Sequence, residues 1–76
     1  MRHERISVDH DVMGGVPCIR GTRIPVATIV SMVAEGMGPE QIVRDFPQLT
    51  RDDVRQALEF AADAVREREL PLRPSA

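Results

Sequence analysis

The sequence predicts a mainly α domain: a three-helix bundle of the helix-turn-helix kind with a short N-terminal β-strand or arm segment. The first observation behind this prediction is that apolar residues recur at helical spacing in three segments between residues 26 and 70. The second is that two very short connections join these segments, so that neighbouring helices must cross sharply. A short helix, a tight turn and a longer helix are typical of a domain that places the start of its last helix in a DNA groove.

The first two helices are predicted at Val26–Glu35 and Pro39–Phe46. Pro25 and Gly36 indicate where the first helix begins and ends. Proline fits the opening turn of a helix, and glycine tolerates the positive φ of a C-terminal cap. Met37, directly after Gly36, is expected to make the apolar contact of a Schellman-type cap. The residues predicted to face inward are Val26, Ile29, Val30, Met32, Val33, Ile42, Val43 and Phe46.

The third helix is predicted at Thr50–Glu69, and its start carries the strongest local signals. Thr50 is placed to cap the helix and Asp53 to complete a capping box. Leu49 and Val54 are spaced as a hydrophobic staple across the same turn. The domain is expected to end at residue 70, with residues 71–76 as a flexible tail. The inward stripe of this helix is predicted to be Val54, Ala57, Leu58, Ala61 and Val65.

Residues 1–25 are predicted to form an extended arm with short strands. Ile6 and Val8 alternate with polar residues, and a second extended piece follows at residues 16–19. A tight turn is predicted at residues 20–23, where Gly21 supplies a positive φ. Short strands that contain proline are not stable alone, so we expect this arm to pack on the helices or on a second subunit.

The length and composition predict one small cytoplasmic domain. A chain of 76 residues can bury only a small core, so we expect a homodimer or a larger partner. Cys18 is the single cysteine, which excludes an internal disulfide and a zinc finger built on paired cysteines. No apolar run is long enough for a membrane span or a signal peptide, so no membrane contact is expected.

Several segments of the chain together resemble the domain of unknown function 433 family. Residues 13–26 carry the run MGGVPCIRGTRIPV, and later segments read EG at residues 35–36, PEQI at 39–42, FPQL at 46–49 and VRQAL at 54–58. The resemblance covers roughly residues 5–66. It implies a homeodomain-like helix-turn-helix fold with an N-terminal extended segment.

The same resemblance implies an antitoxin of the VapB type, whose gene lies beside that of a PIN-like ribonuclease toxin. The expected function is therefore to bind and inhibit such a toxin and to bind operator double-stranded DNA for autoregulation. The alternative is a protein–protein interaction module that uses the helix-turn-helix only as a scaffold. The formal net charge of −2 favours this alternative, because DNA binding by counterion release needs clustered basic side chains.

The start of the third helix carries the candidate DNA-binding residues. Arginine can read guanine and glutamine can read adenine from this position in a helix-turn-helix. The alternative is an ordinary exposed helix face, on which Asp52 and Asp53 serve as N-terminal caps and repel phosphates. The candidate DNA-binding residues are Thr50, Arg51, Arg55 and Gln56.

The tight turn carries the candidate partner-binding residues Arg20, Gly21, Thr22 and Arg23. The two guanidinium groups that flank the turn can hold phosphate or enter the acidic metal site of a PIN-like nuclease. The alternative is that these arginines form salt bridges that fix the arm on the helices. The carboxylates available for such bridges are those of Asp9, Asp11 and Glu35.

No catalytic, metal or cofactor site is predicted. Asp9, His10 and Asp11 are adjacent in an extended segment, where three neighbouring side chains cannot all face one ion, and we interpret them as a solvated turn. His3 is a further metal-ligand candidate that we set aside in the same way. Cys18 has no orienting group or oxyanion loop near it in sequence, so we do not expect an enzyme.

Overall fold

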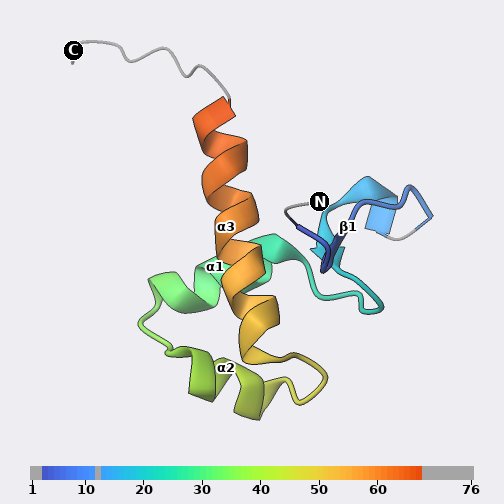
Figure 1. Cartoon of the computed structure of the whole chain (residues 1–76). Helices are drawn as coiled ribbons and strands as arrows, with labels where there is room; N and C mark the ends of the chain where they lie inside the picture. Colours follow the sequence, from blue (N-terminus) through green and yellow to red (C-terminus); the bar gives the residue numbers. More distant parts are fainter. Residues whose placement is uncertain (1–2, 12, 68–76) are drawn as a thin grey trace, which may run out of the picture.

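Three helices form the body of the protein in the computed structural model, which describes residues 3–11 and 13–67 (Figure 1). The helices are α1 (Val26–Ala34), α2 (Pro39–Asp45) and α3 (Arg51–Glu67), and α3 packs on both α1 and α2. The mainly α fold with an N-terminal strand segment is thus confirmed. The predicted end of the third helix at Glu69, the domain boundary at residue 70 and the flexible tail at 71–76 lie outside the described residues.

The end of α1 has the predicted Schellman cap. Gly36 has a φ of 97°, and its N–H donates to the carbonyl of Val33 at 2.9 Å. The N–H of Met37 donates to the carbonyl of Met32 at 3.1 Å, which completes the motif. This cap turns the chain directly from α1 into α2.

The start of α3 has the predicted capping box. The Thr50 hydroxyl accepts from the N–H of Asp53 at 3.0 Å, and the Asp53 carboxylate accepts from the N–H of Thr50 at 3.0 Å. Leu49 and Val54, the two residues of the predicted staple, are both buried. The local sequence therefore determines where α3 begins.

The arm consists of β1 (Ile6–Ser7), the 3-10 turn η1 (Met13–Gly15) and β2 (Cys18–Ile19). The two strands pair antiparallel, with Ile6 opposite Ile19, and Cys18 also forms a bridge with Pro25 on its other side. The turn between Ile19 and Ile24 has Gly21 at a φ of 81°, as predicted. The arm is thus a small sheet that leads straight into α1.

The arm and the helices share one core. Residues of the arm and of its turn are buried together with residues of all three helices. The buried apolar residues are Ile6, Cys18, Ile19, Ile24, Val26, Ile29, Met32, Ile42, Leu49, Val54 and Ala57. The prediction that Val65 faces inward is wrong, because 60% of its surface is exposed. Toward its C-terminal end α3 extends beyond α1 and α2 (Figure 1).

Within residues 3–11 and 13–67, none of the helices has the length and apolarity that a lipid bilayer crossing requires.

Candidate functional site

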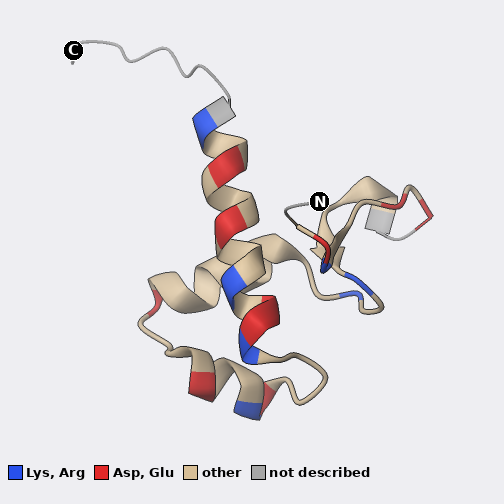
Figure 2. Cartoon of the chain, in the orientation of Figure 1, with Lys and Arg blue, Asp and Glu red and all other residues tan. Residues whose placement is uncertain are grey.

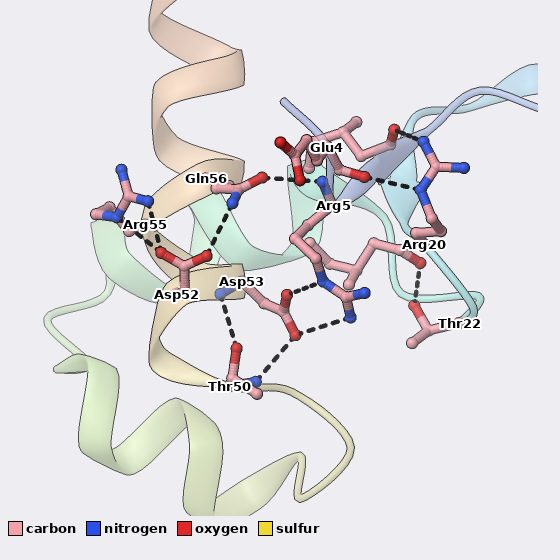
Figure 3. Close-up of polar contacts among 11 residues, drawn as sticks. Glu4, Arg5, Arg20, Thr22, Thr50, Asp52, Asp53, Arg55 and Gln56 are labelled. Carbon is pink, nitrogen blue, oxygen red and sulfur yellow. Dashed lines mark hydrogen bonds and ion pairs between the residues drawn. The ribbon is translucent and has the colours of Figure 1, made fainter. Parts of the chain in front are cut away.

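The arm is attached to the start of α3 by Arg5 (Figure 3). The Arg5 guanidinium donates from Nε to Oδ1 of Asp53 at 2.6 Å, and the Arg5 backbone N–H donates to Oε1 of Gln56 at 2.9 Å. The Asp53 side chain is completely buried, whereas 41% of the Arg5 side chain is exposed. The arm therefore covers one side of the helix start that a helix-turn-helix would present to DNA.

The Asp53 carboxylate stays ionised because its partners outweigh its burial. Burial alone would raise the pKa of Asp53, but hydrogen bonds from Arg5 and from Thr50 lower it below the ordinary value of 3.8. The charge of Asp53 also raises the pKa of Arg5. The buried Asp53 carboxylate thus caps α3, binds the arm and neutralises the charge of Arg5.

The two arginines at the predicted DNA-binding position are already paired with acidic residues of the same domain. Arg51 forms an ion pair with Glu40 of α2 at 2.8 Å. Arg55 donates to Asp52 from Nε at 3.0 Å and to Glu59 from Nη1 at 2.8 Å. Two cations therefore face three carboxylates, and Figure 2 shows that acidic and basic residues alternate along this part of α3.

The other two predicted DNA-binding residues also have internal partners. The Thr50 hydroxyl caps α3, as described above. The Gln56 amide accepts from the backbone of Arg5 with its oxygen, and its nitrogen donates to Asp52 at 2.8 Å. To bind an adenine with both amide atoms, Gln56 would have to release the arm.

The tight turn presents a different charge arrangement. Arg20 donates from Nε to the carbonyl of Glu4 at 2.7 Å and from Nη2 to the carbonyl of Ile6 at 3.1 Å. Both acceptors are neutral backbone carbonyls rather than carboxylates. Arg23 is exposed, and its side chain has no ion pair or hydrogen bond with any described residue. The alternative prediction, that Arg20 and Arg23 form salt bridges with Asp9, Asp11 or Glu35, is therefore wrong.

Thr22 and Gly21 shape the turn rather than present groups to solvent. The Thr22 hydroxyl donates to the carbonyl of Ile19 at 2.8 Å and accepts from the N–H of Ile24 at 3.0 Å. Gly21 is exposed at the tip, with nothing within 4 Å of the place where a Cβ would stand. Beside the turn lies an open hollow of about 390 Å³, whose lining includes Asp9 and Arg23.

The histidines and acids near the N-terminus do not converge on a metal position. Among the described residues, no group of three His, Cys, Asp or Glu side chains lies close enough together to hold an ion. The Asp9 carboxylate instead accepts from the N–H of Asp11 at 2.8 Å, as in an ordinary turn. His3 lies against α3, where its Nε2 is 2.9 Å from Asp63 and its ring meets Phe60 edge-on.

Sequence reasoning missed Arg5, which organises the helix start. Arg5 and Asp53 are separated by 48 positions, so no periodicity or spacing connects them. The sequence contained only an indirect indication that such a residue was needed. A capping-box aspartate beside a buried staple loses its water, and a carboxylate in that position needs a cation from elsewhere in the chain.

Comparisons with known proteins place this geometry in a wider group. The family model described as "Protein of unknown function (DUF433)" matches residues 6–61. The uncharacterized protein y4eO of Sinorhizobium fredii is 35% identical over 58 residues, which make up 76% of this chain and 26% of that protein. The chain therefore spans about a quarter of the length of this curated relative.

A solved structure is also similar. The crystal structure of a DUF433 member protein from Anabaena variabilis matches with a TM-score of 0.75 at 30% sequence identity. The match covers 83% of this chain and 62% of the crystallised chain.

Proposed function

We propose that this chain, which belongs to the DUF433 family of proteins of unknown function, is a protein-binding module of the antitoxin type. The partner is a PIN-like ribonuclease, and the binding group is the turn at residues 20–23. The proposal rests on the location of the arginines whose positive charge is not paired with a carboxylate. The arginines at the start of α3 are neutralised within the domain, whereas Arg20 and Arg23 form no ion pair with any described residue.

The chemistry of the turn suits an acidic site. The metal-binding carboxylates of a nuclease form a concentrated negative charge, and a guanidinium group can donate two parallel hydrogen bonds to a carboxylate. The turn is rigid, because Thr22 closes it and Arg20 fixes it to the arm. A rigid turn loses little conformational entropy on binding, so more of the interaction energy appears as affinity.

Replacement of Arg23 by alanine is expected to weaken binding of the ribonuclease encoded by an adjacent PIN-like reading frame. Truncating one partner of a buried charge pair costs about 2–5 kcal/mol, which corresponds to a loss in affinity of about 30-fold or more. The measurement is inhibition of the purified ribonuclease by increasing amounts of wild-type or variant protein. Arg23 forms no hydrogen bond or ion pair with any described residue, so the fold should not change.

Arg44 of α2 provides a matched control. It is an exposed arginine that also forms no ion pair among the described residues, but it lies away from the turn. Arg44→Ala should inhibit as wild type does. Equal inhibition by wild type and Arg23→Ala would exclude the turn, and absence of any inhibition by the wild type would overturn the proposal as a whole.

The lone domain is further proposed not to read DNA with the start of α3. At physiological salt we expect no specific mobility shift on the region upstream of its own gene. Neutralising the carboxylates around Arg55 by the double change Asp52→Asn and Glu59→Gln should create weak, steeply salt-dependent DNA binding, because it releases a cation. Asp45→Asn, an exposed acid on α2, is the control. A specific shift with the wild type that Arg51→Ala and Arg55→Ala abolish would restore the DNA-binding interpretation.

A further inference from the structure

The hollow beside the tight turn contains side chains of both charges. It has a volume of about 390 Å³. The end of β1 and the residues after it supply Ser7 and Asp9 to its lining, and the turn supplies Thr22 and Arg23. Asp9 and Arg23 are both exposed. A ligand that enters the hollow therefore meets one acidic and one basic side chain.

Three side chains of the hollow have hydrogen-bonding groups that no described residue uses. The Asp9 carboxylate accepts from the N–H of Asp11 through Oδ1, and its Oδ2 has no partner in the described chain. The Ser7 hydroxyl and the Arg23 guanidinium form no hydrogen bond with any described residue. The hollow thus offers an anionic acceptor, a cationic donor and a hydroxyl that can act as either.

The two charges of the hollow remain separate. Asp9 and Arg23, both described, line the same hollow but form no ion pair with each other. The bond from Asp11 holds the Asp9 carboxylate in its own turn, and Thr22 closes the turn that carries Arg23. A ligand gains most if it brings a cation to Asp9 and an anion to Arg23, whereas Asp9 repels a ligand that is only anionic.

The backbone around the hollow is fixed by the fold. Ser7 pairs with Cys18 in the two-stranded sheet. Cys18 is buried, and its thiol donates to the carbonyl of Val16 at 3.3 Å. Because the sheet and the turn hold the backbone of both walls, the walls do not have to be ordered by a partner, and little backbone entropy is lost on binding.

We propose that Asp9 determines the specificity of the turn: it binds a basic side chain of the ribonuclease while Arg23 binds a carboxylate of the same protein. The inference rests on the function proposed above, and it adds a second contact and a class of ligand that is excluded. A ribonuclease that uses metal ions has both charges in one place, because carboxylates hold the metal and cationic side chains hold the phosphates of RNA. The backbone of RNA has only negative charge, so Asp9 repels it.

Asp9→Asn tests the contact with the ribonuclease. Asparagine keeps the oxygen that accepts from Asp11, so the local turn should keep its shape while the charge is lost. Inhibition of the purified ribonuclease from the adjacent PIN-like reading frame should weaken about 10-fold, as expected for the loss of one charge pair across an interface. The thermal midpoint followed by circular dichroism should not change, because Asp9 is exposed.

Asp9→Arg tests the exclusion of RNA with this chain alone. The probe is a fluorescently labelled oligouridylate at low salt, and the measurement is its anisotropy. The wild type should leave the anisotropy unchanged. Asp9→Arg should raise it, by binding the probe at least about 10-fold more tightly and with a steeper dependence on salt, because two cations then line the hollow. A residue that only supports the fold would not create a new binding activity when it is replaced.

Asp11 provides the matched control. It is an exposed aspartate of the same turn, its side chain forms no bond with a described residue, and it does not line the hollow. Asp11→Asn and Asp11→Arg make the same changes in net charge outside the hollow. Both variants should inhibit the ribonuclease as the wild type does, and both should leave the RNA probe unbound.

Three results would overturn the inference while the proposed function stands. The first is inhibition by Asp9→Asn equal to that by the wild type, and the second is an equal effect of the Asp9 and Asp11 variants, since net charge would then explain both. The third is RNA bound by the wild type as tightly as by Asp9→Arg, which would assign the hollow to nucleic acid. If the wild type inhibits no ribonuclease, the proposed function fails together with the contact to Asp9, and the anisotropy measurement alone decides whether Asp9 excludes RNA.

Discussion

Replacement of Arg5 by alanine is expected to destabilise the domain by about 3 kcal/mol, the lower end of the cost of breaking a buried ion pair. The change leaves the fully buried Asp53 carboxylate without its cation. The lower end applies because Arg5 itself is 41% exposed, so water can partly replace it. Small domains are stable by only about 5–15 kcal/mol, so the loss is a large fraction of the total. Urea denaturation followed by circular dichroism measures it.

Arg51→Ala is the control for this prediction. Arg51 also forms an ion pair at the start of α3, but its side chain is 68% exposed and that of Glu40 is 60% exposed. Exposed pairs contribute about 0–1 kcal/mol. If the two variants lose equal stability, burial of Asp53 is not what makes the Arg5 pair important.

The effect of Arg5→Ala should depend on pH in a defined direction. In the wild type the pKa of Asp53 is lowered from 3.8, so its contribution to stability is present above that pH and is lost as the pH falls through the folded-state pKa. In the variant, Asp53 is buried without Arg5, so its uncharged, protonated form is favoured. Protonation at low pH therefore removes the cost of burying an unpaired carboxylate. The difference in unfolding free energy between the two proteins should therefore be largest near neutral pH and shrink as the pH falls toward and then below 3.8. A constant difference across this range would contradict the assignment.

Replacement of Ile19 by alanine is expected to cost about 2–5 kcal/mol, the usual range for truncating a fully buried isoleucine. Ile19 lies in β2 of the arm and is 0% exposed, as is Ile29 of α1. The two truncations should therefore be similarly destabilising. Each should lower the midpoint of a single unfolding transition, in which the arm and the helices unfold together. Thermal unfolding followed by circular dichroism measures both.

Val8→Ala is the matched truncation outside the core, because Val8 is 58% exposed on the same arm. It should leave the midpoint nearly unchanged. If Ile19→Ala also left the helices at full stability, the arm would be an appendage of an independent three-helix domain. The candidate turn would then lose the support that holds it beside the helices.

The capping residues show how much of the fold the sequence predicts. The capping box joins Thr50 to Asp53, and the Schellman cap joins Gly36 to the last turn of α1. The residues within each cap are only a few positions apart in the sequence, so the geometry of each follows from local chemistry. The helix positions and the turn at Gly21 follow for the same reason. Val65 fits the same helical period, yet period does not reveal where the neighbouring helix ends.

The sequence by itself determined the positions of the helices, the caps at the end of α1 and the start of α3, the tight turn and the family, because these depend on interactions between near neighbours or on a contiguous motif. Only the tertiary structure decided what the arginines do. Arg5 reaches a buried carboxylate 48 positions away, and Arg51 reaches Glu40 on another helix. Arg20 binds carbonyls of the arm, and Arg23 on the same turn forms no ion pair within the part of the chain that the structure describes. Charge pairing depends on distance in space, and folding sets that distance independently of separation along the chain.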